Sequence, residues 1–224
     1  MTETGAKVRV WDLATRLFHW SLAALVVAAV VTAQIGGNAL AWHFYCGYTI
    51  LALLLFRILW GVIGARYARF SSFALRPSSF LEHIRARKAG ALKPYAGHSP
   101  FGSLSVLLIL LVLLAQAVTG LFANDDIASE GPLAKFVSQE VSDKLSAFHA
   151  DLNSVLIYIL VGLHVAAVAY YFVFQRQNLV KPMITGDKER LEPEAAARDG
   201  WRGRVLALVL FALCFGAVIW VSKL

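Results

Sequence analysis

The strongest constraint on this chain is a series of five apolar segments, each long enough to cross a lipid bilayer. The segments cover residues 17–35, 43–64, 104–122, 152–174 and 205–221. About 20 apolar residues in an α-helix span a hydrocarbon core of roughly 30 Å, where the helix satisfies its own backbone hydrogen bonds. Because 58% of the 224 residues are hydrophobic, a soluble domain of this length could not bury them all. The sequence therefore predicts an all-α integral membrane protein, a helical bundle of five transmembrane helices.

The charged residues lie mainly in the loops, and their sign alternates along the chain. Basic residues precede the first segment and fill the loops after the second and fourth segments: Lys7, Arg9, Arg16, Arg66, Arg69, Arg76, Arg85, Arg87, Lys88, Lys93, Arg176, Lys181, Lys188, Arg190, Arg198, Arg202 and Arg204. The loop 123–150 is acidic instead, with Asp125, Asp126, Glu130, Glu140 and Asp143 against Lys135 and Lys144. The positive-inside rule then predicts a cytoplasmic N-terminus, with the acidic loop and the C-terminus on the outer side. The net charge of +7 does not favour a nucleic-acid partner, because the basic residues lie in loops that flank the membrane spans.

Local signals mark several helix ends. Asp12 with Thr15 is typical of a helix start, the glycines at 36–37 break the chain, and Ser99-Pro100 supplies a cap and a first-turn proline. We also expect a short surface helix at 78–88, a short amphipathic helix near 133–145 and a polar cytoplasmic linker over 177–204.

Four of the six histidines lie inside or at the ends of the apolar segments. If Gly36, His43 and His149 mark the outer surface, His19 lies 17 residues below Gly36, or about 25 Å along a helix. His164 lies 15 residues below His149, or about 22 Å, and roughly 60° around the helix axis from it. The depths therefore pair His43 with His149 near the outer face, and His19 with His164 near the inner face.

Two pairs of imidazoles at two depths suit two haems, each with two axial ligands. Ionisable groups inside a membrane span are costly and usually functional. Such a centre carries electrons, because filled axial positions leave no room for oxygen or substrate. Taken singly, a histidine at a segment end also fits a bond to a carbonyl or a place among headgroups. Cys46 and Cys214 form no Cys-x-x-Cys-His motif, so covalent c-type attachment is not expected.

Several separated motifs are distinctive: 10–20 (VWDLATRLFHW), Trp42-His43 with Gly47-Tyr48, Phe56-Arg57 with Trp60-Gly61 and Gly64, Gly97-His98-Ser99-Pro100, Thr119-Gly120-Leu121-Phe122, and His149 followed by Gly162-Leu163-His164. In these motifs residues 8–176 resemble the bacterial cytochrome b561 / nickel-hydrogenase b-type cytochrome family. The resemblance implies a four-helix core that holds two haem b groups, with iron ligands at His19, His43, His149 and His164. The family pairs these ligands as the depths do, and the segment 205–221 lies beyond the core that resembles it.

The resemblance also implies partners and a location. These are the bacterial inner membrane, a quinone or quinol, and a periplasmic redox protein such as a c-type cytochrome or a hydrogenase. The chain is then an electron-transfer protein, either a quinone oxidoreductase or the cytochrome b subunit of a redox enzyme. The sequence leaves open whether it forms a homodimer.

Two arginines and one further histidine are candidates for supporting roles. Arg57, toward the inner end of its segment, either snorkels to the interface or meets a haem propionate. Arg16 is a similar candidate, although a residue at a helix start also suits headgroups. His98 suits either a propionate or proton contact near the inner face, or a solvated loop.

Other classes of function remain as alternatives. A haem-free membrane anchor, or a transporter subunit of a partner complex, would use the same five spans. A transporter predicts broken helices or buried acidic groups along a path, and the segments show neither. A single metal ion is disfavoured by the difference of about 22 Å in histidine depth.

Overall fold

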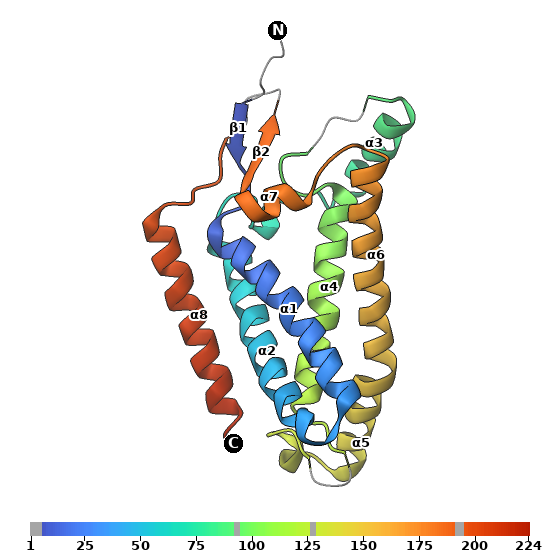
Figure 1. The fold of residues 1–224 in the computed structure, drawn as a ribbon, viewed down its shortest axis with the longest axis vertical. Helices are drawn as coiled ribbons and strands as arrows, with labels where there is room; N and C mark the ends of the chain where they lie inside the picture. Colours follow the sequence, from blue (N-terminus) through green and yellow to red (C-terminus); the bar gives the residue numbers. More distant parts are fainter. Residues whose placement is uncertain (1–5, 92–94, 126–128, 191–194) are drawn as a thin grey trace. The chain divides into compact units, whose positions relative to one another are not determined.

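A computed structural model of the chain describes residues 6–91, 95–125, 129–190 and 195–224. Asp126 and Lys93, which count toward the charge pattern, lie outside the described residues. Five helices in the described part are long and apolar enough to span a membrane: α1 (Leu13–Ile35), α2 (Leu40–Ile63), α4 (Pro100–Gly120), α6 (Ser154–Val173) and α8 (Trp201–Val221) (Figure 1). The predicted class, an all-α membrane bundle, is confirmed.

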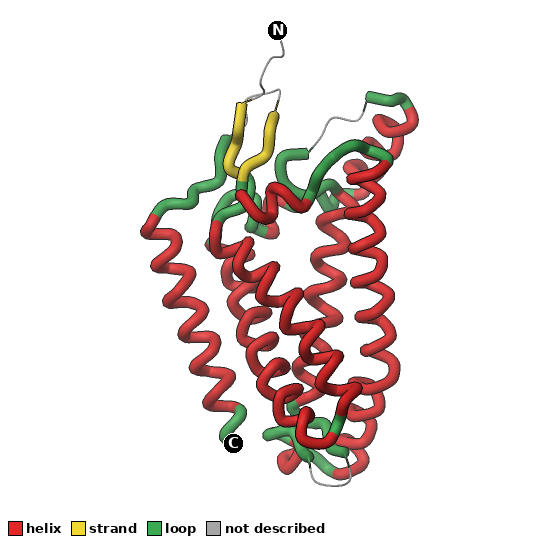
Figure 2. The backbone as a smooth tube through the Cα atoms, viewed as in Figure 1, coloured by secondary structure: helices red, strands yellow, loops and turns green. Residues whose placement is uncertain are grey.

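Shorter elements connect the long helices, and Figure 2 separates them by type. They are β1 (Ala6–Arg9), α3 (Pro77–Lys88), α5 (Gln139–Ala147), a π-helix (Phe148–Asn153), α7 (Val180–Thr185), β2 (Asp187–Arg190), and 3-10 turns at Gly37–Ala39, Phe70–Ser72 and Ala134–Phe136. The surface helix expected at 78–88 is present as α3. The helix expected near 133–145 is instead a 3-10 turn followed by α5, because Ser138 caps α5 at the Val141 amide.

Helix starts follow the capping residues of the sequence. Asp12 accepts hydrogen bonds from the Thr15 amide at 3.0 Å and the Thr15 hydroxyl at 2.7 Å, so α1 begins four residues before the apolar segment does. The Ser99 hydroxyl accepts from the Gly102 amide at 3.2 Å, and Pro100 opens α4. Between α1 and α2 the chain turns at Gly36 and Gly37, whose φ angles of 65° and 53° favour glycine.

The chain divides into two compact units, and each long helix contributes to both. The first unit holds the chain up to Leu17, Leu59–Leu108 and Leu163–Ala207, and the second holds Phe18–Ile58, Ile109–Gly162 and Leu208–Leu224. The described members of all three basic clusters belong to the first unit. The turn at 36–39 and the acidic loop belong to the second unit.

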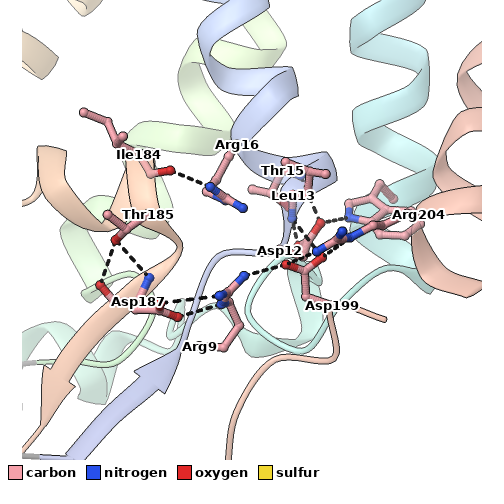
Figure 3. A network of polar contacts seen from close by, with 11 residues as sticks. Arg9, Asp12, Leu13, Thr15, Arg16, Ile184, Thr185, Asp187, Asp199 and Arg204 are labelled. Carbon is pink, nitrogen blue, oxygen red and sulfur yellow. Dashed lines mark hydrogen bonds and ion pairs between the residues drawn. The ribbon is translucent and has the colours of Figure 1, made fainter. Parts of the chain in front are cut away.

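In the first unit, the segment expected to be a polar linker contains β2, which pairs with β1, and takes part in a charge cluster. β1 pairs with β2 in antiparallel register from Ala6–Arg190 to Arg9–Asp187. Arg9 binds Asp187 at 2.6 Å and Asp199 at 2.7 Å, while Asp199 also accepts from Arg204 and from the Leu13 amide, both at 3.2 Å (Figure 3). Asp199 thereby joins β1 to the first residues of α1 and α8.

In the second unit, α8 packs against α2. A buried cluster joins Leu51 and Ala52 of α2 with Leu121 and with Val218 of α8, which is 2% exposed. Other large apolar side chains point outward, and Leu208 on α8 is 67% exposed, as expected of a helix face that contacts lipid. The fifth helix is therefore part of the packing of this chain, a role that the sequence left open.

The pKa of Asp199 predicts a pH-dependent contribution to stability. Burial raises this pKa, but hydrogen bonds from Arg204, Leu13 and Arg9 outweigh burial and hold it below its ordinary value. The stabilisation is therefore present above the unfolded pKa of about 3.9 and is lost as the pH falls through the folded pKa. We expect Asp199→Asn to lower the free energy of unfolding by about 1 kcal/mol at pH 7 and by less at pH 3. The effect at pH 7 is small because both arginines are partly exposed to solvent.

Thermal unfolding in detergent at both pH values measures this difference. Glu189→Gln is the matched control, since the ion pair between Glu189 and Lys181 is 3.6 Å long and exposed. An equal loss of stability by Asp199→Asn at the two pH values would refute the assignment.

Candidate haem-binding site

The four histidines are divided between the two units. His19 on α1, His43 on the first turn of α2 and His149 in the π-helix belong to the second unit. His164, on α6, belongs to the first unit. All four side chains are partly buried. The pair His43 and His149 thus lies within one unit, where its geometry is described.

The His43 and His149 rings lie close together in an edge-on arrangement. Their centroids are 6.0 Å apart and their planes are nearly perpendicular, at 87°. If each ligating nitrogen lay about 2.0–2.1 Å from a shared metal, as in zinc sites, the ring centroids would be roughly 6.4 Å apart. The spacing of the two rings therefore matches that of two imidazoles on opposite faces of one metal.

Backbone carbonyls fix which nitrogen of each ring is free to bind a metal. His43 Nδ1 lies 2.9 Å from the Ala29 carbonyl oxygen, and His149 Nδ1 lies 2.9 Å from that of Gln116. A carbonyl only accepts, so each neutral ring donates its Nδ1–H and keeps a lone pair on Nε2. Metal-binding histidines are oriented by this kind of second bond.

A glycine makes room for the His149 ring. A Cβ atom at Gly120 would lie 2.8 Å from His149 Cε1 and 3.2 Å from Nδ1, closer than real side chains approach. Cβ atoms at Gly47 or Gly162, the glycines of two other motifs, would meet no atom within 4 Å in the described structure. Gly120, in the Thr119–Phe122 motif, is therefore needed for the position of the imidazole.

Arg57 on α2 is buried beside Phe18, the residue on α1 at which the second unit begins. It is 3% exposed, and its guanidinium carbon lies 6.0 Å from the centroid of the Phe18 ring. The neighbouring His19 ring packs edge-on against Trp20, with centroids 5.0 Å apart. A snorkelling side chain would end in water, so the snorkelling interpretation of Arg57 does not hold. The guanidinium lies beside the residue that precedes His19.

The remaining candidates have partners in the first unit. Arg16 Nη1 donates to the Ile184 carbonyl at 2.5 Å, near the end of α7, and its Nε is buried without a hydrogen-bond partner among the described residues (Figure 3). His98 is partly buried, with ring centroids 4.7 Å from Trp11 and 5.1 Å from Phe73. The solvated loop position considered for His98 is therefore wrong.

A conventional metal-ion site is not assembled by the described residues. No group of three or more His, Cys, Asp or Glu side chains gathers there in a way that could hold an ion. A pair of imidazoles alone suits a metal whose other ligands come from a cofactor, and the haem macrocycle supplies four nitrogens. His43 and His149 fit such a group in ligand type, in ring spacing and in the nitrogen that each ring leaves unprotonated.

Comparison with known proteins identifies the family. The family model for prokaryotic cytochrome b561 matches residues 10–186, which include all four histidines and end before α8. No curated protein and no solved structure matches the chain. The chain therefore belongs to the prokaryotic cytochrome b561 family, and is a bacterial membrane protein that binds haem b and transfers electrons.

Proposed function

We propose that the protein transfers electrons across the bacterial inner membrane through two b haems, between the quinone pool and a periplasmic redox protein. His43 and His149 are the ligands of the outer haem, and His19 and His164 are those of the inner haem. The observation that carries the proposal is the close pair of His43 and His149, with ring centroids 6.0 Å apart and each Nδ1 bonded to a backbone carbonyl.

The inner pair rests on helix geometry. His149 and His164 are separated by 15 residues, part of them in the π-helix. A π-turn accommodates one extra residue, which rotates the rest of the helix by about 100°. In a regular helix the His164 side chain would be rotated by roughly 60° about the helix axis from that of His149. With the extra residue in the π-turn, it is rotated by roughly 40° in the opposite direction. Both imidazoles stay on one face of the helix, as two haems at different depths require.

The chemistry divides simply between cofactor and chain. When bound, haem would supply a one-electron couple, and His43 with His149 and His19 with His164 would hold the two groups, which would leave electron transfer as the reaction. Arg57 is placed to neutralise an anionic group near His19, and we assign that group as a haem propionate. We assign Arg16 a similar role toward the inner haem, with one nitrogen held by the Ile184 carbonyl.

Protons are expected to move only near the surfaces. The five long helices contain no Asp, Glu or Lys, so the spans offer no carboxylate relay for protons. Quinone chemistry, which consumes or releases protons, then belongs at a membrane face.

The charge of the loops supports the orientation and the class of partner. Basic residues precede the first span and follow the second and fourth spans, whereas the loop after the third span is acidic, which supports a cytoplasmic N-terminus and a periplasmic C-terminus. In the acidic loop, Asp125 and Glu130 are exposed. An acidic periplasmic face would attract a basic redox partner by charge steering.

Histidine substitutions test the ligand pairs. We expect two haems per chain in the wild-type protein, and about one in either His164→Ala or His149→Ala. The two variants should lose different components of the reduced spectrum, because each removes a ligand of a different haem. Haem extraction and difference spectra at controlled potential measure both quantities.

His83→Gln is the matched control and should retain two haems, since His83 is 2% exposed and bonded to Tyr95 rather than placed in a span. Loss of the same component in both alanine variants would refute the pairing. A colourless wild-type protein from haem-replete cells would favour the anchor or transporter alternative.

Gly120→Ala tests the position of the His149 ring without removing a ligand. The new methyl would push on Cε1, so we expect the outer spectral component to fall several-fold while the inner one persists. The control is Gly216→Ala on α8, where a Cβ meets nothing within 4 Å and alanine favours the helix by about 1 kcal/mol. Equal haem retention in the two variants would contradict the contact.

Neutralising the acidic loop tests the docking face. Asp125→Asn, Asp126→Asn and Glu130→Gln together should slow electron exchange with a basic c-type cytochrome at low salt and flatten the dependence of the rate on salt. The Ser129 amide donates a hydrogen bond to the Asp125 carboxylate at 2.8 Å. Asparagine at position 125 keeps a side-chain oxygen that can accept this bond. Stopped-flow oxidation measures the rate, with Glu82→Gln on α3 as the control. An unchanged rate and salt slope would exclude this loop from docking.

A further inference from the structure

His149 lies in a π-helix, which is an unusual place for a ligand. The π-helical segment Phe148–Asn153 separates α5 from α6. π-Helical turns are rare and usually form where a function requires them. Their wider spacing weakens the ordinary helical hydrogen bonds, so other groups must hold such a segment in place. These groups come from α4.

Gln116 on α4 holds both ends of His149. Its side-chain amide Nε2 donates to the backbone carbonyl of His149 at 3.0 Å. Its own backbone carbonyl accepts from His149 Nδ1 at 2.9 Å. One residue therefore fixes the main chain and the ring of the proposed ligand, and two fixed points leave the imidazole little freedom to rotate.

Asn153 locks Gln116 in place. Asn153 is the last residue of the π-helix and is 1% exposed. Its Nδ2 donates to Gln116 Oε1 at 2.7 Å and to the Val112 carbonyl at 3.1 Å. The hydrogen bonds thus run from Val112 and Gln116 on α4 to both ends of the segment that carries His149.

Two amides in an apolar bundle require a reason. A polar side chain in a membrane interior is costly unless it is fully bonded. Leucine would fill the same space between α4 and α6 without that cost. The bonds of Gln116 and Asn153 converge on His149 and its π-helix, so helix association alone does not account for where they point.

We propose that Gln116 and Asn153 are positioning residues for the outer haem, which set the plane and the hydrogen bond of the His149 imidazole. This rests on the proposed function, in which His149 is an axial ligand. A bonded Nδ1–H makes the imidazole a stronger donor to iron and stabilises the oxidised state. The pair thereby fixes the near-perpendicular ligand planes and lowers the midpoint potential of that haem.

The test uses Gln116→Leu and Asn153→Leu in the haem-loaded protein. The largest EPR g value of an oxidised low-spin haem falls as two perpendicular ligand planes turn toward parallel. Both variants keep the Gln116 backbone carbonyl but remove the side-chain bonds that hold His149 in line with it. We therefore expect this g value to decrease and the midpoint potential to rise for the outer haem, while the inner haem stays unchanged. Gln34→Leu, on an exposed position of α1, is the matched control and should match the wild type.

A double variant separates positioning from stability. Gln116→Leu with Asn153→Leu leaves neither amide unpaired, so part of the thermal stability lost in the single variants should return. The EPR and potential shifts should remain. If Gln116→Leu does not accumulate, Gln116→Met has nearly the same volume and tests the same bonds.

The outcomes distinguish the two proposals. A wild-type protein without haem would overturn the proposed function. A haem-loaded wild type whose Gln116 and Asn153 variants lose stability but keep its g values and potentials would overturn only the positioning role. Faster hydrogen exchange of the amides at 148–153 in the variants would support that role independently of electron transfer.

Discussion

The bond between an imidazole N–H and a backbone carbonyl is the interaction on which the proposed haem site depends. Inside a membrane no water satisfies a neutral histidine, so the ring must find its acceptor within the protein. Ala29 and Gln116 provide that acceptor for His43 and His149. The same bond that removes the cost of burial also selects the tautomer, because it leaves Nε2 as the base. The same bond therefore satisfies the buried polar group and prepares the proposed metal ligand.

The long helices and their starts could be predicted from the sequence because the causes are local. A run of apolar residues sets each span, and Asp12 and Pro100 set where α1 and α4 begin. β1 and β2 could not be predicted in this way. Each has only four residues, of which two are charged in β1 and all four in β2, and the strands pair across some 180 positions, with Arg9 opposite Asp187. Four-residue charged segments carry no strand signal without their partner.

For the candidate site as well, only part of the arrangement could be predicted from the sequence. The depths of the histidines, counted along helices, bring His43 and His149 to one level, and in the structure their ring centroids lie 6.0 Å apart with nearly perpendicular planes. The π-helix and the bonds of Gln116 and Asn153 were not anticipated. A π-turn has no local sequence signature, because it forms where tertiary bonds compensate for it. The available signal was Gln116 itself, an uncharged amide in an apolar stretch of α4.

The fifth helix shows how a segment beyond the family match becomes part of the fold. Its first turn is held by Arg204, which binds Asp199 together with Arg9. Further along, Phe211 packs edge-on against Phe56 of α2, with centroids 6.2 Å apart, and Val218 is buried near Ala52. Phe56 precedes Arg57, the buried cation assigned to a propionate. Because α8 packs on this stretch of α2, it helps to bury Phe56, which is 4% exposed, next to Arg57.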